Sequence, residues 1–427
     1  MKVSFYTLGC KVNQYETQIM SQMFSQNGYE VVDFETPADV CVVNSCTVTS
    51  SSDRKTRQIL RKIKTQNPKT VVCLTGCMPQ AFPKLSFENA DIVLGNTSRK
   101  DVLEKVGQFL KTPEKIKDIK DHTKDEEFER MCADAFLERT RATIKIEDGC
   151  DRFCTYCIIP YARGRIRSKS LEDIKKEAQN LSLKGYSEVV LVGINLSSYG
   201  KNTPLRLIDA IETVCEVEGV KRVRLGSLEP ELLTDDDIHR MSKLEKFCPQ
   251  FHLSLQSGCD ETLKRMNRHY TAEEYKRIVE NIRKHFDNPA ITTDIMVGFA
   301  GETDEEFNKS LEFAKEIGFA KAHIFCYSRR EGTIAAKMPD QVEESVKKKR
   351  SAELIKATDR SRNEFLSSQI GTVADVLFET AEHGVNHGYT KNYTPVFVED
   401  ERDLKGKILK VKITKVKNDY CIGQLEE

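Results

Sequence analysis

The stretch ATIKIEDGCDRFCTYC, residues 142–157, combines the two features that decide the fold of this chain. It starts with a short β-rich apolar run, and the loop that follows carries Cys150, Cys154 and Cys157 within eight residues. Free cysteines in protein cores occur singly, whereas soft thiolates at short spacing suit zinc or an iron–sulfur cluster. The stretch therefore predicts a strand that ends in a metal-binding loop.

The number of cysteine ligands in this loop distinguishes a zinc site from an iron–sulfur cluster. A structural zinc site generally has four protein ligands, but the next cysteine is Cys215 and no histidine follows within the usual distance. Three thiolates on an iron–sulfur cluster leave one iron open, and an open position can bind a substrate or cofactor directly. The spacing favours a cluster with one open iron.

Downstream of this loop, β-rich runs alternate with amphipathic helical stretches as far as Ser328. Six βα units predict a full or partial barrel. The turns after the strands are polar and rich in glycine, and the carboxyl ends of such strands share one site. The predicted strands are 142–146, 188–192, 222–225, 250–255, 291–297 and 321–325.

Upstream, three predicted strands alternate with helices at 15–26 and 54–65, which predicts a parallel α/β sheet. The strands are 2–8, 39–44 and 70–75, and Cys10, Cys46 and Cys77 each follow the end of one. Parallel strands bring these ends to one edge, so the cysteines are expected to converge. The residues alone leave two readings open, a second ligand set or buried cysteines like Cys41 and Cys73.

The rest of the chain completes a three-unit α/β protein. Residues 340–369 favour a connecting helix, and 371–427 favour a small β-barrel. The 427 residues have zero formal charge, 39% hydrophobic content and no run of about 18 apolar residues, so we expect a cytoplasmic protein with no membrane partner. The predicted units are 1–112, an exposed connector at 113–139, 140–366 and 367–427.

The cysteine loop and its flanks, 147–150 and 158–165, resemble the radical S-adenosylmethionine (SAM) methylthiotransferases. Residues 7–13, 44–49 and 75–77 are similar to the amino-terminal domain of that family, and the carboxy-terminal region is similar to a TRAM RNA-binding barrel. The resemblance implies SAM and two [4Fe–4S] clusters, one held by Cys150, Cys154 and Cys157. The other, auxiliary cluster would be held by Cys10, Cys46 and Cys77.

Residues 8–16, 224–230 and 266–270 most resemble the branch that acts on N6-threonylcarbamoyladenosine beside the anticodon of transfer RNA (tRNA). The resemblance implies as partners this tRNA, an electron donor and a sulfur source. Relatives that act on isopentenyladenosine tRNA or on a ribosomal-protein aspartate share the cluster motifs, and residues 195–197 depart from the pattern. An alternative of another class is a noncatalytic, metal-stabilised RNA-binding adaptor, which the βα array disfavours.

Polar, aromatic and glycine residues near the predicted site are candidates for binding SAM. Alternative readings are packing for the aromatic side chains, caps and ion pairs for the polar ones, and a tight strand-to-helix turn for the glycines. The candidates are Phe153, Tyr156, Ser227, Glu229, Ser254, Gln256, Arg265, Gly298, Gly301 and Glu302.

Because the net charge is zero, RNA binding needs local basic patches. One follows the cysteine loop, and the other, 405–417, has six lysines and no acid. In the second patch, the lysines move from even-numbered to odd-numbered positions after Lys412, a shift that permits a β-bulge. An alternative reading is that charged residues on an edge strand simply deter aggregation. The predicted RNA contacts are Arg163, Arg165, Arg167, Lys169, Lys410, Lys412, Lys415 and Lys417.

Overall fold

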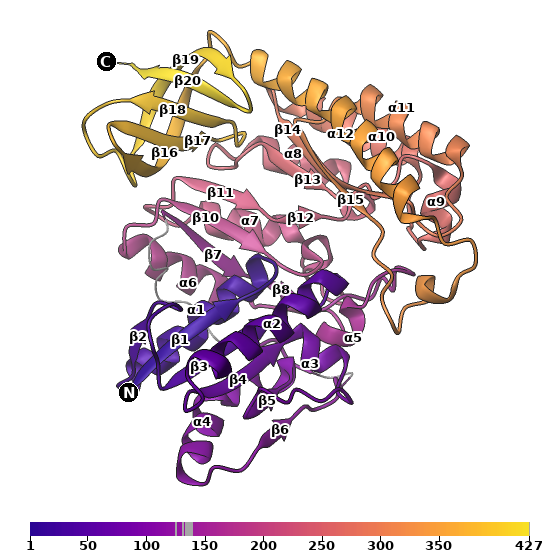
Figure 1. Ribbon diagram of the computed structural model, residues 1–427. Coiled ribbons are helices and arrows are strands. Elements are labelled where there is room, and N and C mark those ends of the chain that lie inside the picture. The colour runs from indigo at the N-terminus through magenta and orange to yellow at the C-terminus, as the bar shows by residue number, and fades with distance from the viewer. Residues whose placement is uncertain (124–125, 130–131, 133–139, 427) are drawn as a thin grey trace.

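The first unit of the computed structural model is a parallel sheet with strand order β2–β1–β3–β4–β5–β6 (Figure 1). Its central strands are buried on both faces, with Cys73 in the apolar core of one face and Cys41 in that of the other. The predicted sheet is confirmed. The elements are β1 (Lys2–Thr7), α1 (Lys11–Gln26), β2 (Glu30–Val32), β3 (Val40–Ser45), α2 (Ser50–Gln66), β4 (Val71–Gly76), α3 (Cys77–Ala81), β5 (Ile92–Leu94), η1 (Asn96–Asp101), α4 (Val102–Lys111) and β6 (Ile116–Asp118).

Strand β6 differs from the sequence-based expectation for residues 113–139. The structure describes residues 1–123, 126–129, 132 and 140–426, and within them β6 pairs with β5 as the edge of the sheet. A three-residue strand with one apolar residue is too short to show a periodic pattern. The rest of the predicted connector lies partly outside the described residues.

The second unit contains all six predicted strands, and every pairing among them is parallel. The strands form two neighbouring sheets, β7–β10–β11 and β12–β13–β14–β15, and the short β12 follows β11 in the chain (Figure 1). No pairing among the described residues joins β7 to β15, so the barrel is partial. The strands are β7 (Arg141–Lys145), β8 (Glu147–Asp148), β9 (Arg167–Ser168), β10 (Glu188–Val192), β11 (Arg222–Leu225), β12 (Ser227–Leu228), β13 (Gln250–Leu253), β14 (Ala290–Val297) and β15 (Lys321–Cys326).

Helices cover the outside of this partial barrel and share one large apolar core with the strands. Capping boxes begin α10 and α11, where Thr271 pairs with Glu274 and Thr303 with Glu306; each cap contributes about 1 kcal/mol. The helices are α5 (Ile159–Arg163), α6 (Leu171–Leu183), η2 (Leu196–Ser198), α7 (Leu207–Cys215), η3 (Pro230–Leu232), α8 (Asp235–Ser242), α9 (Asp260–Arg265), α10 (Ala272–His285), α11 (Asp304–Ile317), η4 (Ala335–Lys337) and α12 (Glu344–Ser367).

The third unit is a closed five-stranded barrel, as predicted, and the long helix α12 leads into it (Figure 1). Arg222 and Arg224 of β11 dock the barrel by donating hydrogen bonds to the carbonyl oxygens of Asp375, Tyr389 and Lys391. No described helix is long and apolar enough to cross a membrane. The strands are β16 (Val373–Glu382), β17 (Val385–Thr390), β18 (Pro395–Glu399), β19 (Ile408–Lys417) and β20 (Tyr420–Leu425).

Candidate active site

Cys10, Cys46 and Cys77, the strand-end triad, lie beyond the carboxyl ends of β1, β3 and β4, which are adjacent in the sheet. Burial, followed by the nearby thiols of Cys77 and Cys10, raises the pKa of Cys46 to about 11. Burial also raises the pKa of Cys10, although this residue reaches the surface. Hydrogen bonds also bring these cysteines to one place, because Asn13 Oδ1 accepts from Cys10 at 3.3 Å and from Arg163 at 3.2 Å, and Arg163 donates to Cys77 Sγ.

Small residues before these cysteines let the strand ends approach closely. Gly76 has φ +102°, and a Cβ there would lie 2.4 Å from the carbonyl oxygen of Ser45. The Ser45 hydroxyl donates to the carbonyl of Thr75 at 2.7 Å and accepts from the Met78 N–H at 3.3 Å. The Cys77 loop is thus fixed against the end of the neighbouring strand.

Cys150, Cys154 and Cys157, the loop triad, lie between β8 and β9, whose antiparallel pairing closes the loop at its base. Gly149, with φ +91°, begins the loop at a point where a Cβ would lie 1.9 Å from the carbonyl oxygen of Arg165. Burial, with the charge of Cys154 adding to it, raises the pKa of Cys150 to about 12 and also raises the pKa of Cys157. These three thiols therefore form a second close group.

The chemistry of the two triads suits iron–sulfur clusters. Within the described ranges, no three cysteine, histidine or carboxylate side chains lie close enough to hold a single metal ion. A [4Fe–4S] cluster instead binds its thiolates through separate irons. Because burial raises the pKa of Cys46, Cys150 and Cys157, these thiols are protonated at neutral pH, and a cluster bound to them would release their protons.

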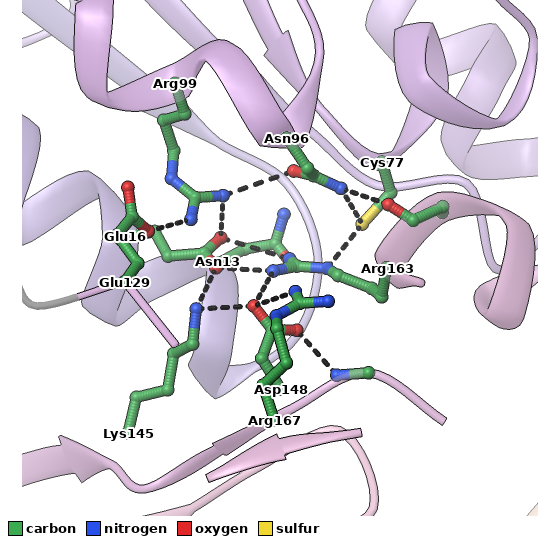
Figure 2. A network of polar contacts seen from close by, with 12 residues as sticks. Asn13, Glu16, Cys77, Asn96, Arg99, Glu129, Lys145, Asp148, Arg163 and Arg167 are labelled. Atoms are coloured by element: carbon green, nitrogen blue, oxygen red, sulfur yellow. Dashed lines mark hydrogen bonds and ion pairs between the residues drawn. The ribbon is translucent and has the colours of Figure 1, made fainter. Parts of the chain in front are cut away.

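Arg163 contacts Cys77 of the strand-end triad inside a buried polar network (Figure 2). It ends α5, which begins two residues after Cys157, and its side chain is fully buried. Its Nε–H donates to Cys77 Sγ at 3.2 Å, while Nη2 donates to the Glu16 carboxylate at 3.0 Å. One side chain therefore links the segment behind the loop triad to the strand-end triad.

Glu16, from α1, is the central anion of this network (Figure 2). Lys145 lies 2.9 Å and Arg99 3.1 Å from its carboxylate, in addition to Arg163. Burial acts to raise the pKa of Glu16, but the charges of Arg163, Arg99 and Lys145 lower it to about 2. Removing one member of such a group leaves a buried charge without its partner, which is costly.

The basic stretch after the cysteine loop is not the exposed patch that its composition predicts. Arg163 is 0% exposed and Lys169 is 2% exposed, and Lys169 is paired with Glu177. The side chain of Arg167 is 10% exposed and lies 3.6 Å from Asp148. The prediction of RNA contacts is therefore wrong for Arg163 and Lys169, because acids from distant segments bury and neutralise these cations.

The two aromatic residues between the loop ligands have different surroundings. Phe153 is 37% exposed, and the guanidinium of Arg165 lies 5.3 Å from its ring centroid. Tyr156 is half-buried and packs edge to face on Phe299 at 6.3 Å between ring centroids. Tyr156 thus has a packing role, while cofactor contact by either ring stays a prediction.

Two of the predicted strand-end residues reach the loop triad through Arg268. Glu229 pairs with this arginine, whose Nη1 also donates to Cys154 Sγ at 3.4 Å. The carbonyl oxygen of Ser254 accepts hydrogen bonds from Arg268 at 3.3 Å and from the Tyr270 hydroxyl at 2.7 Å. Sequence reasoning placed Arg268 in a family motif but gave it no role.

Ser227 and Gln256 are two more of the residues predicted to bind SAM. Ser227 is exposed on β12. Gln256 is buried with φ +65°, and its Oε1 has no hydrogen-bond partner among the described residues. Because a buried oxygen without a partner is costly, Gln256 is suited to accept a hydrogen bond from a ligand.

The glycine-rich turn after β14 is held by contacts within the chain. Arg265 pairs with Glu306 at 2.6 Å and donates to the Gly301 carbonyl at 3.2 Å. Glu302 pairs with Arg350 of α12 at 2.8 Å and accepts from the Gly298 N–H at 2.6 Å. The turn is thus a tight strand-to-helix connection, and cofactor contact by its residues stays a prediction.

The lysines of β19 lie on the outside of the third unit, and the expected bulge is present. The register between β19 and β20 shifts between Ile413 and Lys415. The extra residue returns the following lysines to the outer face, so all four are exposed: Lys410, Lys412, Lys415 and Lys417. Their contact with RNA stays a prediction.

Sequence reasoning missed two residues beside the loop triad. The Asn195 side-chain amide lies 3.8 Å from Cys150 Sγ, and its backbone N–H donates to Glu147 at 2.7 Å. Burial raises the pKa of Glu147 well above its usual value. The signal that could have found Asn195 is its place in the polar turn after β10.

Three family models match the chain, and each match falls in one of the units described above. They are the radical SAM superfamily over residues 144–314, the uncharacterized protein family UPF0004 over 2–97 and the TRAM domain over 367–425.

Threonylcarbamoyladenosine tRNA methylthiotransferase MtaB of Bacillus subtilis (strain 168) is 41% identical over 433 residues, which is 99% of this chain and 96% of the relative. The chain belongs to the radical SAM methylthiotransferase family. Another methylthiotransferase, MtaB of Aquifex aeolicus (strain VF5), is 37% identical over 97% of this chain and 100% of its own. A tRNA-2-methylthio-N(6)-dimethylallyladenosine synthase of Clostridium botulinum (strain Loch Maree / Type A3) is 36% identical over 98% and 95%.

Solved structures of the wider superfamily have a similar fold. The radical SAM methyltransferase TsrM from Kitasatospora setae, with tryptophan substrate and a SAM analogue bound, aligns with a TM-score of 0.58. The alignment covers 89% of this methylthiotransferase and 79% of TsrM at 12% identity. This likeness concerns the fold alone.

Proposed function

We propose that this chain converts N6-threonylcarbamoyladenosine next to the tRNA anticodon to its 2-methylthio derivative. The observation that carries the proposal is the pair of cysteine triads, with Arg163 from the helix behind the loop triad bonded to Cys77 of the strand-end triad. One triad suffices for radical SAM cleavage, and a second one beside it adds a site for sulfur. Similarity to two MtaB proteins along the whole chain favours this substrate.

We infer that the loop triad and the strand-end triad bind one [4Fe–4S] cluster each. The two clusters and SAM, when bound, supply a carbon radical that removes hydrogen from an unactivated C–H bond and the sulfur and methyl groups that are transferred. The residues of the chain bind and orient these groups and exclude water. Asn195 and Arg268 donate toward the sulfur atoms of Cys150 and Cys154, which stabilises their thiolate forms.

Two alternatives within the family keep the chemistry and change the substrate. Isopentenyladenosine tRNA is the more specific of them, because a dimethylallyladenosine synthase is 36% identical over 98% of the chain. A ribosomal-protein aspartate is the other. The adaptor hypothesis is disfavoured, because an adaptor would not need two close thiol groups at the strand ends of two different sheets.

The proposed function also requires partners that supply electrons and sulfur, and a cytoplasmic location where tRNA is accessible. Asp151, next to Cys150, pairs with Lys201 at 2.7 Å and with Arg165 at 3.3 Å, so charged side chains lie beside the loop triad. An electron donor could therefore be steered toward this loop by its charge.

Mass spectrometry of tRNA nucleosides from strains with and without this gene tests the substrate and the reaction together. We expect 2-methylthio-N6-threonylcarbamoyladenosine to disappear in the deletion strain and to return with the intact gene. A gene with Cys150→Ala should not restore it, whereas Cys215→Ala, far from both triads in sequence, should. Loss of the dimethylallyl derivative instead would assign the other branch.

Anaerobic reconstitution separates the enzyme from the adaptor. Two [4Fe–4S] clusters require about eight irons per chain, and reduction with SAM should release 5′-deoxyadenosine. A protein that binds RNA but holds no iron and releases no deoxyadenosine would be the adaptor.

A further inference from the structure

Helices α10, α11 and α12 cover one face of strands β13, β14 and β15, and the other face lines the inside of the partial barrel (Figure 1). Ile295 and Ile324 pack in the apolar core that the strands share with these helices. Because neighbouring residues of a strand point to opposite faces, Asp294 and His323 lie on the inside. His323 is exposed there, and the side chain of Asp294 is 35% exposed. The side chains on this face that matter here, the inner wall, are His252, Asp294, Met296, Lys321, His323 and Phe325.

The inner wall changes in character along the strands. Nearest the carboxyl ends, Met296 is paired with Phe325, whose side chain is 38% exposed. Asp294 and His323 form the next pair toward the amino ends, and the exposed Lys321 comes one step further. Successive residues on one face of a strand lie roughly 7 Å apart. The wall therefore runs from apolar through polar to cationic with increasing depth in the partial barrel.

The apolar end of the inner wall adjoins both cysteine triads. Tyr156, between the ligands of the loop triad, packs on Phe299, which contacts Tyr327 at 5.2 Å between ring centroids. Tyr327 directly follows β15. Three residues further on, Arg330 donates to the Thr47 hydroxyl at 2.7 Å, beside the strand-end triad. A base held at the apolar end of the wall would therefore lie next to both triads.

The deeper part of the inner wall offers hydrogen-bonding groups to a ligand. His252 lies 3.3 Å from the carboxylate of Asp294 and 3.0 Å from the hydroxyl of Thr292, so its imidazole holds Asp294 in place. Neither His323 nor Lys321 makes a hydrogen bond or ion pair within the described part of the chain. Partial burial lowers the pKa of His323 against the charge of Asp294, so the neutral ring keeps one donor and one acceptor.

We propose that the inner wall selects the N6 substituent of the substrate adenosine, with the adenine ring on Phe325 and the substituent directed toward Lys321. The inference rests on the proposed function and adds the residues that choose the substrate. His323 and Asp294 are placed to hydrogen-bond the carbamoyl and hydroxyl groups of a threonylcarbamoyl substituent, and Lys321 to pair with its carboxylate. A dimethylallyl substituent has no polar atoms, so it would displace water from the wall without replacing the hydrogen bonds.

Binding of three fluorescent anticodon stem-loop RNAs to the reconstituted full-length protein, measured anaerobically by anisotropy, tests the inner wall. The RNAs share one sequence and carry threonylcarbamoyladenosine, dimethylallyladenosine or unmodified adenosine beside the anticodon. We expect the wild type to bind the first most tightly. Lys321→Gln and His323→Leu should each lower its preference over the unmodified RNA by about 3- to 10-fold. The variant with both changes should bind the dimethylallyl RNA more tightly than the wild type does.

Two further variants separate recognition of the substituent from other effects. Phe325→Leu should weaken binding of all three RNAs alike, because they share the adenine ring. Lys284→Gln is the matched control, since Lys284 is an exposed lysine in the last turn of α10, outside the partial barrel, and should change no preference. Because Lys321 and His323 are exposed, their variants should keep the wild-type melting temperature and about eight irons per chain.

A wild-type preference for the threonylcarbamoyl RNA that both Lys321→Gln and His323→Leu retain would overturn this inference and leave the proposed function standing. Equal weakening of all three RNAs by Lys321→Gln would also overturn it, because the lysine would then contact the RNA backbone and not the substituent. A wild type that binds the threonylcarbamoyl RNA no better than the dimethylallyl RNA would instead overturn the proposed substrate, and this inference with it.

Discussion

The guanidinium of Arg163 lies between the thiol of Cys77 and the carboxylate of Glu16 and donates hydrogen bonds to both. Its five N–H groups reach both partners at once, and its burial excludes water from the gap. The residue therefore acts on the strand-end triad by position and charge.

Replacing this arginine tests the network at the level of a single residue. We expect Arg163→Gln to lower the free energy of unfolding by about 3–5 kcal/mol, because Glu16 stays buried with one cation fewer. Arg165→Gln is the control and should cost less than about 1 kcal/mol, since its side chain is 55% exposed in a surface pair. Urea unfolding of the two variants measures the difference.

Iron retention gives the same substitution a second readout. Arg163→Gln should lose iron from the strand-end triad sooner than from the loop triad, because only Cys77 loses a hydrogen-bond donor. Electron paramagnetic resonance of the reduced protein distinguishes the two clusters. Equal stability of both variants and equal loss of both clusters would show that Arg163 has no such role.

At the residue scale, short-range spacing was predictable and long-range pairing was not. Cys150, Cys154 and Cys157 form a pattern within one loop, so their grouping is visible in the chain. Arg163 and Lys169 were mistaken for RNA contacts because their partners, Glu16 and Glu177, belong to other elements. Composition shows which charges a segment carries, but only the fold shows what neutralises them.

The loop between β8 and β9 depends on a turn that admits no side chain. The Cys150 N–H donates to the Gly164 carbonyl at 3.0 Å, directly beside the close approach of Gly149 to Arg165. The backbone, and not a cap or an ion pair, thus sets where the first cysteine of the loop triad lies.

An alanine at this turn should open the loop. Gly149→Ala forces the backbone apart, so we expect the protein to lose iron from the loop triad and to stop forming deoxyadenosine, while the strand-end triad keeps its iron. Gly185→Ala is a matched control, because Gly185 has φ +90° and no atom within 4 Å of its added Cβ. It should cost only about 1 kcal/mol of backbone strain. Normal cluster content in Gly149→Ala would contradict this account.

Elements with a long apolar pattern were predictable, and short polar ones were not. The six strands of the partial barrel and the three strands before the strand-end triad are rich in apolar, β-branched and aromatic residues, which mark them clearly. The bulge in β19 was predictable because Lys412 and Lys415 break the period of two. In contrast, β6 has a single apolar residue, and its strand conformation depends on pairing with β5.

Docking of the third unit on the second depends on an ion pair that is sensitive to acid. Glu188 lies 2.7 Å from Arg224, which in turn donates to the Lys391 carbonyl at 2.9 Å. Burial acts to raise the pKa of Glu188, but the charges of Arg224, Arg141 and Arg222 lower it below its usual value. Its stabilising effect is therefore present at neutral pH and is lost as the pH falls from about 4.5 through the lowered pKa.

The substitution Glu188→Gln should remove this pH dependence. We expect the variant to be less stable than wild type near neutral pH, with a difference in melting temperature that shrinks as the solution is acidified. Asp400→Asn is the control, because Asp400 pairs with Arg402 on an exposed loop of the barrel and should change the melting temperature little. A constant difference between wild type and Glu188→Gln across this pH range would contradict the prediction.

At the scale of the whole molecule, the three units were predictable but their arrangement was not. The β-barrel was visible from its turns and short strands, yet nothing in residues 222–224 indicates that two strand arginines would bind its backbone. A cavity lined by Lys11, Arg141 and Tyr393 likewise takes its walls from all three units. Contacts of this kind depend on relative orientation, which no local pattern encodes.

The buried network also has a consequence for synthesis of the protein. Glu16, Cys77 and Arg99 leave the ribosome before Arg163 does, and the 64 residues from Lys100 to Arg163 take roughly 3 to 13 seconds to translate. During that interval the nascent amino-terminal sheet has no guanidinium to cover Cys77. We expect the thiols of the strand-end triad to be open to delivery of iron and sulfide during that interval, until Arg163 has been translated and can pack against Cys77.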